Sequence, residues 1–217
     1  WDETFVYLGR GSGKNGFASF VSFCMISPAH GIAKYDVDIC ANSEDQAKTS
    51  FTDVHDILED NVKRYKRAFT WNLEVIKNKK TGSKLRYRTD NPNSKDGLRS
   101  GMVIFDEVHQ YQNWKNINVF TTGLGKKPHP RRLYLTTDGD VRDGVLDSLL
   151  SKARSILNGE KSDNGFLPFI CRLDSDDEVH DERMWEKAVP SLRYREDLLI
   201  QILKEYNDYL ENPAIAT

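Results

Sequence analysis

The apolar residues of the chain fall into short runs and helical stripes that alternate from the start. The run at 5–8 predicts a strand, and a glycine-rich turn follows it. The apolar residues after this turn recur at helical spacing until Ser27-Pro28 ends the pattern, and they are Phe17, Phe20, Val21, Cys24 and Met25. The chain therefore begins with a strand, a loop and a helix.

A second strand and helix follow directly. The run at 35–41 predicts a strand, and Ser43 with Gln46 three residues later has the pattern of a helix capping box. The apolar stripe of the predicted helix consists of Ala47, Phe51, Val54, Ile57 and Leu58. Two such units in succession are typical of a parallel sheet.

The remaining patterns extend the same architecture. They predict, in order, a hairpin of alternating runs at 71–78 and 84–89, buried parallel strands at 102–107 and 131–137, a helix over 143–157, a last strand at 166–173 and a helix over 193–210. We therefore expect an α/β fold. Its central, mostly parallel sheet would be flanked by helices and would bind a ligand at the carboxyl ends of the strands.

Length and composition allow one substantial core. The chain has 217 residues, of which 38% are hydrophobic and 29% are charged, a size that suits one domain with a small appendage. No apolar run is long enough to cross a bilayer, and no signal-peptide pattern is present at the start. We therefore expect a soluble, intracellular protein. Its cysteines, Cys24, Cys40 and Cys171, are widely spaced, which favours free thiols over disulfides or a zinc site.

Charge is distributed unevenly, although the net charge is only −2. Residues 61–90 contain ten Lys or Arg against two acids, whereas residues 174–182 contain six acids and no Lys or Arg. Such separation permits a basic face that contacts a polyanion, and a simple solvated surface is the plainer interpretation.

The turn after the first strand has the composition of a phosphate-binding loop. Backbone N–H groups would surround phosphate oxygens, and Lys14 would meet the charge of the β- and γ-phosphates. The residues assigned to this loop are Gly9, Arg10, Gly11, Ser12, Gly13, Lys14 and Asn15. Asn15 replaces the Ser or Thr that usually holds Mg²⁺, although a carboxamide oxygen can also bind that ion. By itself, the segment is equally compatible with an ordinary glycine turn.

Two further motifs follow in the order that nucleotide hydrolysis requires. Asp106, at the end of an apolar strand, would hold Mg²⁺, and Glu107 would polarise the attacking water. A surface acidic pair is the plainer alternative. Thr136 and Thr137 end the next strand, where their hydroxyls would sense the γ-phosphate or reflect only β-propensity. Because the three motifs occur in this order, together they are a more specific signal of nucleotide hydrolysis than any one motif alone.

In this order the motifs resemble the ATPase domain of the large terminase subunit, the DNA-packaging motor of tailed bacteriophages. The resemblance rests on GRGSGKNG in the loop, ANSEDQA at 41–47, SKDGLRSGMVIFDEVHQY at 94–111, LTTDGD at 135–140 and MWEKAVPSL at 184–192. It spans nearly the whole chain and implies a P-loop NTPase fold of the RecA-like (ASCE) class.

The resemblance also implies the chemistry of the site. ATP and Mg²⁺ would be the cofactors. Lys14 and Arg10 would contact phosphates, Asp106 would serve the metal, and Glu107 would be the catalytic base.

Coupling and assembly are implied in the same way. Thr136 and Thr137 would couple hydrolysis to movement. Members of this family work as homo-oligomeric rings in which a neighbouring subunit is thought to supply an arginine, and Arg99 is our candidate for that residue. Alone, the chain is expected to be a monomer.

The resemblance further implies a cellular setting. The chain would drive double-stranded DNA, bound without regard to sequence, into a procapsid through the portal protein, in concert with the small terminase subunit. It would work in the host bacterial cytoplasm and dock transiently on the portal. We divide the chain into an ATPase core at 1–175 and a helical lid or linker at 176–217 that leads toward a nuclease domain, which we expect to be absent here.

Two other functions fit parts of the pattern. DEVH at 106–109 matches the box of DExH helicases, although a helicase needs a second RecA-like domain for which no length remains. A catalytically weak P-loop assembly module is the other alternative, because of Asn15. The basic segments that would contact DNA are 61–69, 77–84 and 126–132.

Overall fold

A computed structural model describes residues 1–88 and 99–212. The chain forms two compact units, one of residues 1–7 and 14–170 and the other of residues 8–13 with the segment from Cys171 onward. We expected a boundary between residues 175 and 176. The second unit instead begins at Cys171 and takes in most of the glycine-rich loop.

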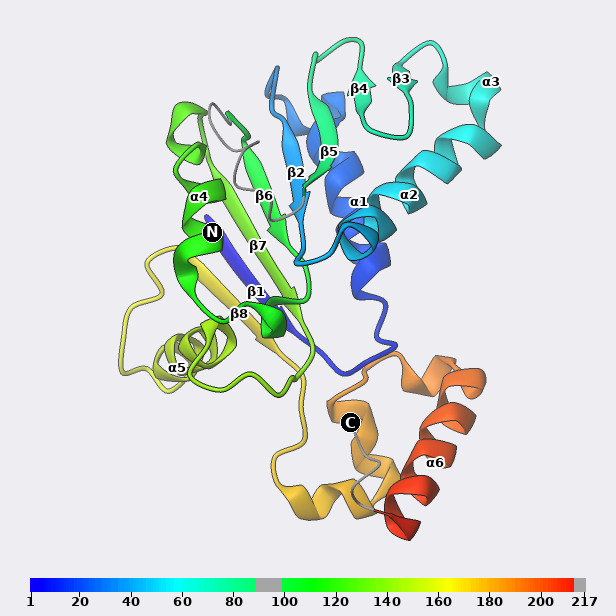
Figure 1. Ribbon diagram of the computed structural model, residues 1–217, viewed down its shortest axis with the longest axis vertical. Helices are drawn as coiled ribbons and strands as arrows, with labels where there is room; N and C mark the ends of the chain where they lie inside the picture. Colours follow the sequence, from blue (N-terminus) through cyan, green and yellow to red (C-terminus); the bar gives the residue numbers. More distant parts are fainter. Residues whose placement is uncertain (89–98, 213–217) are drawn as a thin grey trace. The chain divides into compact units, whose positions relative to one another are not determined.

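An eight-stranded sheet dominates the first unit (Figure 1). Its strands are β1 (Glu3–Tyr7), β2 (Val37–Cys40), β3 (Phe69–Trp71), β4 (Ile76–Asn78), β5 (Lys84–Arg88), β6 (Met102–Phe105), β7 (Arg131–Thr136) and β8 (Phe166–Ile170). Their order in the sheet is β3-β4-β5-β2-β6-β7-β1-β8. In this order, every neighbouring pair from β5 through β2, β6, β7 and β1 to β8 is parallel. Strands β3 and β4 add an antiparallel extension at the β5 side of the sheet. The mostly parallel sheet that the sequence predicts is confirmed.

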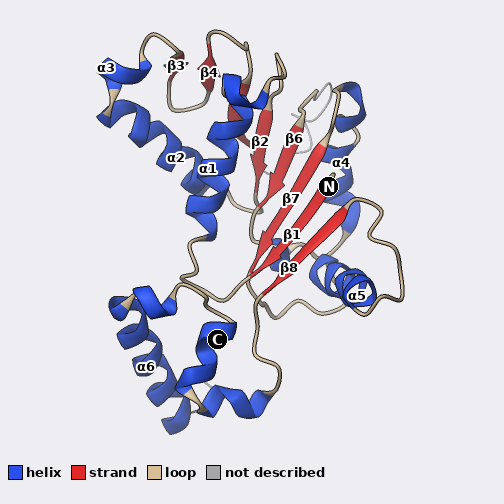
Figure 2. Cartoon of the chain, turned by 180° about the vertical axis from the view of Figure 1, so that it is seen from behind, coloured by secondary structure: helices blue, strands red, loops and turns tan. Residues whose placement is uncertain are grey.

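Helices cover both faces of this sheet (Figures 1 and 2). On one face lie α1 (Lys14–Ile26) and α2 (Glu44–Asp60), and the short α3 (Val62–Tyr65) follows α2. On the other face lie α4 (Trp114–Thr121), which we did not predict, and α5 (Val145–Leu157). The Ser43 side chain accepts a hydrogen bond from the Gln46 N–H at 3.3 Å, which confirms the predicted cap of α2. Short 3₁₀ helices occur at Pro28–His30, Val108–Gln110 and Leu124–Lys126.

The buried face of α1 differs from the one that its apolar spacing predicts. Phe20 is 67% exposed, whereas Ala18, Ser19 and Ser22 are buried. Ser19 Oγ lies 3.0 Å from both the Ser50 carbonyl oxygen and a carboxylate oxygen of Asp53, so it binds α2 directly. Small side chains let the two helices approach closely, and this close contact outweighs the apolar pattern.

The predicted hairpin is present, but its first run is divided. Asn72 accepts hydrogen bonds from the N–H groups of Glu74 and Val75, which makes a turn between β3 and β4. Strands β4 and β5 then pair in antiparallel fashion, with Lys77 opposite Lys84.

The second unit is helical over the described residues from 171 onward. It contains 3₁₀ helices at Asp176–His180, Glu182–Lys187 and Leu192–Tyr194, followed by α6 (Glu196–Glu211). Trp185, Val189, Leu192 and Leu198 form its small core. In both units, the described helices are all too short or too polar to cross a membrane.

Candidate active site

Lys14 is the first residue of α1 and follows the carboxyl end of β1 by way of the glycine-rich loop. It is only 7% exposed, which is unusual for a lysine. The preceding Gly13 has a φ of 82°, in the left-handed region that glycine adopts without strain. Asn15 is the second residue of the helix, and its carbonyl oxygen accepts a hydrogen bond from Ser19 Oγ at 2.7 Å.

Asp106 directly follows β6 and is 2% exposed. Its N–H donates to the Cys40 carbonyl oxygen at 2.9 Å, so pairing with β2 continues past the end of the strand. Burial, together with the nearby Glu107 charge, raises the pKa of this carboxyl to about 6. The hydrogen bond from the Glu107 N–H and the positive charge of Lys14 act on that pKa in the opposite direction.

Glu107 adopts a left-handed backbone conformation, with φ 49° and ψ 51°. This region is uncommon for a side chain of this size and carries a cost of about 1–3 kcal/mol. The turn sends the chain into the 3₁₀ helix at Val108–Gln110. It also brings Oε2 of Glu107 to 3.2 Å from Nδ1 of His109.

His109 connects this carboxylate to the end of the neighbouring strand, β7. Its backbone N–H donates to Thr136 Oγ1 at 3.0 Å, and its ring Nδ1 lies 3.3 Å from the same oxygen. The Thr136 hydroxyl donates its own proton to the Thr137 carbonyl oxygen at 2.7 Å. Because the Thr136 hydroxyl proton is donated to Thr137, the contact between Nδ1 and Thr136 Oγ1 is a hydrogen bond only in the tautomer whose Nδ1 carries the proton. We did not predict His109 as a site residue, although the DEVH box was a visible signal.

Gly139, in the loop after β7, holds the His109 ring closely. A Cβ atom at this position would lie 2.5 Å from Cδ2 of the ring. Any larger residue would therefore displace His109. Thr136 is fully buried and Thr137 nearly so, which leaves their hydroxyls bonded within the protein: Thr137 Oγ1 donates to the Asp138 carbonyl oxygen at 3.1 Å.

Loop residues 8–13 belong to the second unit, where two of the glycines have packing roles. The Gly9 N–H donates to the Ala188 carbonyl oxygen at 2.8 Å, and a Cβ at Gly9 would lie 2.7 Å from Val189. A Cβ at Gly11 would lie 2.6 Å from Leu198. The segment at 184–192 that resembles the terminase pattern therefore packs on the loop itself. Ser12 Oγ closes the turn by donating to the Gly9 carbonyl oxygen at 2.7 Å, and Arg10 is exposed.

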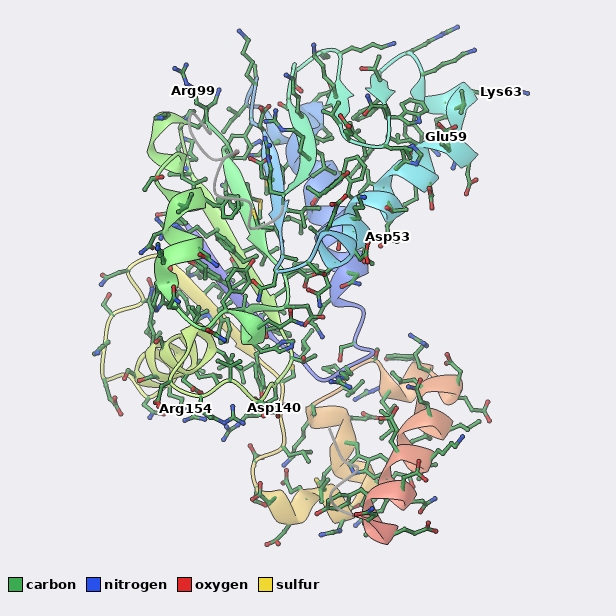
Figure 3. All side chains as sticks on the ribbon, viewed as in Figure 1. Asp53, Glu59, Lys63, Arg99, Asp140 and Arg154 are labelled. Carbon is green, nitrogen blue, oxygen red and sulfur yellow. The ribbon has the colours of Figure 1, made fainter. Side chains whose placement is uncertain are left out.

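Arg99 lies apart from the other predicted site residues of the first unit. Figure 3 shows Arg99 near the amino end of β6 and Asp140 beyond the carboxyl end of β7, so the two residues lie at opposite ends of the parallel strands. The length of β6, roughly 13 Å at 3.3 Å per residue, separates Arg99 from Asp106. Arg99 is exposed and cannot reach the Asp106 carboxylate of its own chain.

The residues present suit Mg²⁺ bound together with a nucleotide. Among the described residues, no group of three or more His, Cys, Asp or Glu side chains is arranged to hold a metal ion. Mg²⁺ is commonly bound by one or two protein oxygens plus substrate phosphates, and it does not need an all-protein cage. Asp106 is a buried carboxylate that a cation would keep ionised, and Asn15 offers a second hard oxygen ligand.

The chain is similar to one known protein family and to several of its members. Residues 1–155 match the family model described as the terminase large subunit, ATPase domain. The terminase large subunit of Lactococcus phage p2 is 26% identical over 196 residues, which cover 87% of this chain and 35% of that protein.

Solved structures show the same fold. The large terminase of bacteriophage HK97 superposes with a TM-score of 0.85 at 15% identity, covering 98% of this chain and 44% of that one. A large terminase from a thermophilic bacteriophage, solved in complex with ADP, gives a TM-score of 0.52 at 11% identity over 85% of this chain and 44% of that one. The chain thus spans less than half the length of these relatives.

The raised pKa of Asp106 predicts that this site lowers the stability of the protein free of metal and nucleotide. The folded state holds the proton more tightly than the unfolded chain, so stability falls as pH rises from about 4 to about 6, and the cost is complete above that range. Asp106→Asn, which retains an acceptor for the Glu107 N–H, should raise the free energy of unfolding by about 1–3 kcal/mol at pH 7.5. The gain should vanish below about pH 4.

Urea denaturation in EDTA at both pH values measures this effect. Asp140→Asn, at an exposed position beyond β7, is the matched control and should change stability by less than about 0.5 kcal/mol at either pH. A less stable Asp106→Asn protein at pH 7.5 would contradict the prediction.

Proposed function

The chain belongs to the family of terminase large subunit ATPase domains, and we propose that it hydrolyses ATP to drive double-stranded viral DNA into a procapsid. One observation carries the proposal: Asp106, Glu107, His109 and Thr136 form one connected cluster at the carboxyl ends of adjacent strands. A buried lysine at the start of α1 supplies positive charge to the same cluster.

In this proposal each residue acts on a different part of ATP. Lys14 and the exposed Arg10 bind phosphate oxygens, together with the backbone N–H groups of residues 9–13. Glu107 orients the attacking water and accepts its proton. A left-handed backbone fixes the direction of its carboxylate before substrate arrives, so little reorganisation is needed.

Asp106 and Asn15 are the residues that would hold Mg²⁺. When bound, the ion neutralises phosphate charge that develops during transfer. Asp106 contributes a buried carboxylate whose position is set by two backbone hydrogen bonds, through its own N–H and from that of Glu107.

Coupling would pass from Glu107 through His109 to Thr136. The ring Nδ1 lies 3.2 Å from Glu107 Oε2 and 3.3 Å from Thr136 Oγ1, so a shift of the carboxylate on hydrolysis would move the imidazole against the end of β7. Thr137, the other predicted coupling residue, follows Thr136 directly and lies in the same short segment of hydrogen bonds.

We infer the partners and the location from the family. A ring of subunits on the portal protein, loaded with the help of the small terminase subunit in the host cytoplasm, would carry out the packaging. In such a ring, we propose that the exposed Arg99 of one subunit acts on the nucleotide of the next. Its distance from the carboxylates of its own chain rules out a role at its own site and is consistent with this proposal.

The principal test is steady-state phosphate release with ATP and Mg²⁺. Lys14→Ala should abolish turnover, because the phosphates lose a buried cation, and Glu107→Gln should lower kcat by about 100-fold or more while ATP still binds. Lys161→Ala, which changes an exposed lysine after α5, is the control and should leave the rate unchanged. Unchanged phosphate release from Glu107→Gln would refute the assigned base.

His109 is expected to act as a positioning residue. His109→Ala should lower kcat by about 10- to 100-fold with little change in KM for ATP, because a carboxylate displaced by an ångström loses alignment with its water. His109→Asn places an N–H close to the original Nδ1 and should recover part of the rate. Equal losses in both variants, or a loss confined to KM, would argue against this role.

The trans role of Arg99 can be tested by mixing two defective proteins. Arg99→Ala retains an intact Glu107, and Glu107→Gln retains an intact Arg99, so a mixed ring can assemble complete sites. The mixture should hydrolyse ATP much faster than either variant alone at the same total concentration, since arginine fingers contribute about 10³-fold or more. Arg154→Ala, an exposed arginine on α5 (Figure 3), should need no partner. Failure of the mixture to recover activity would exclude Arg99.

A further inference from the structure

Basic residues gather on the extension that α3, β3, β4 and β5 make at the edge of the sheet. Residues 61–88 contain ten Lys or Arg and a single acid, Glu74. Two of the basic segments predicted from the sequence meet here: the Lys79 N–H donates to the Ala68 carbonyl oxygen, and Lys79 Nζ donates to that of Lys66. Figure 3 shows Lys63 at the outer end of this extension. The fold therefore brings these two basic segments together on the extension.

One face of the extension is hollowed into a groove of about 640 Å³. Its lining includes Lys77 of β4 and Lys84, Arg86 and Arg88 of β5. Because side chains alternate along a strand, the three β5 cations share one face and follow each other at about 6–7 Å. The opposite face of β5 packs against α2, where Tyr87 contacts Phe51 at a ring distance of 5.2 Å.

Lys77 and Lys84 stand directly opposite each other across the β4–β5 pair. Like charges in this position destabilise a sheet. Among the described residues, neither ammonium group forms an ion pair that would relieve the repulsion. Lys84 does act favourably on the nearby Asp36 carboxylate, whose pKa its charge lowers.

Two carboxylates, Asp36 and Asp38, hold the two arginines of the groove in place. Asp38, which is fully buried, lies 3.4 Å from Nε of Arg86 and 3.2 Å from Nε of Arg88. Asp36 accepts a hydrogen bond from Nη2 of Arg86 at 2.8 Å. Ser100 also hydrogen-bonds to Asp38. The guanidinium groups are thus preorganised, so an anion that binds them loses little free energy in ordering their side chains.

We propose that this groove binds the phosphate backbone of duplex DNA, as the contact by which the domain holds its substrate. The inference rests on the proposed packaging function, which names DNA as the substrate, and it adds the surface. Four cations line the groove against one acid, Glu74. Asp36 and Asp38 pair with the two arginines, but Lys77 and Lys84 leave an excess of positive charge that complements a polyanion. Contacts from these cations to phosphate oxygens carry no base information, so the proposed contact is independent of sequence.

The third predicted basic segment does not join this groove. Residues 126–132 lead into β7, which is separated from β5 by β2 and β6 in the sheet. Within that segment Arg132 pairs with Glu3 at 2.6 Å, and Arg131 lies 3.3 Å from the His30 ring. Its position in the sheet therefore places this segment outside the groove.

The test compares the wild-type chain with Lys77→Gln/Lys84→Gln in equilibrium binding to a fluorescent duplex of random sequence, without nucleotide, at several salt concentrations. The double variant should bind more weakly at every concentration, and the slope of log K against log salt should fall by about two. Lys115→Gln/Lys161→Gln, which removes the same charge from exposed positions outside the extension, should match the wild type.

Two further measurements separate this proposal from others. The urea midpoint of Lys77→Gln/Lys84→Gln should lie close to that of the wild type, because removing the Lys77–Lys84 repulsion offsets the lost attraction of Lys84 to Asp36. An unchanged midpoint would exclude misfolding as the cause of weak binding. ATP hydrolysis by the double variant without DNA should be unchanged. The ATPase test with Lys14→Ala and the DNA-binding test with this double variant can therefore fail independently of each other. Wild-type DNA affinity in the double variant would overturn the proposal and point to an acidic protein as the occupant. A wild-type chain that does not bind duplex at low salt would overturn it as well.

Discussion

Parallel pairing of β6 with its neighbours β2 and β7 is the constraint on which the candidate site depends. The register places Phe105 beside Cys40 and Tyr134, so the chain leaves both strands at the same edge of the sheet. The hydrogen bond from the Asp106 N–H to the Cys40 carbonyl oxygen extends this pairing by one residue. A slip of one residue would reverse the faces and carry the carboxylates away from Thr136. The positions of the candidate site residues relative to one another therefore depend on the strand register.

Several features of the molecule oppose folding, and each lies where the proposed function needs it. Asp106 is buried with a raised pKa, and Glu107 is held in a left-handed conformation. At the sheet edge, Lys77 faces Lys84. Natural proteins tolerate such costs at functional sites because the surrounding structure outweighs them. Here the surroundings are the strongly buried strands β2, β6 and β7 and the helices that cover them.

The strands and the order of motifs could be predicted from the chain, because apolar runs and their polar ends are local signals. The buried face of α1 could not. Its exposed Phe20 looks like a core residue by spacing, and its buried Ser19 looks like a surface residue, because the contact with α2 selects small size over hydrophobicity. His109 was missed for a related reason. Its role appears only when Thr136, 27 residues away, is brought beside it.

The sequence by itself determined the alternation of strands and helices, the glycine-rich loop, and the carboxylates that follow a buried strand. These are properties of neighbouring residues and follow from periodicity and side-chain chemistry. Only the tertiary structure decided that Gly9 and Gly11 serve packing against Val189 and Leu198, and that Lys77 stands opposite another cation. Such facts join residues that are distant in the chain, and their energies depend on which surfaces meet after the chain has folded.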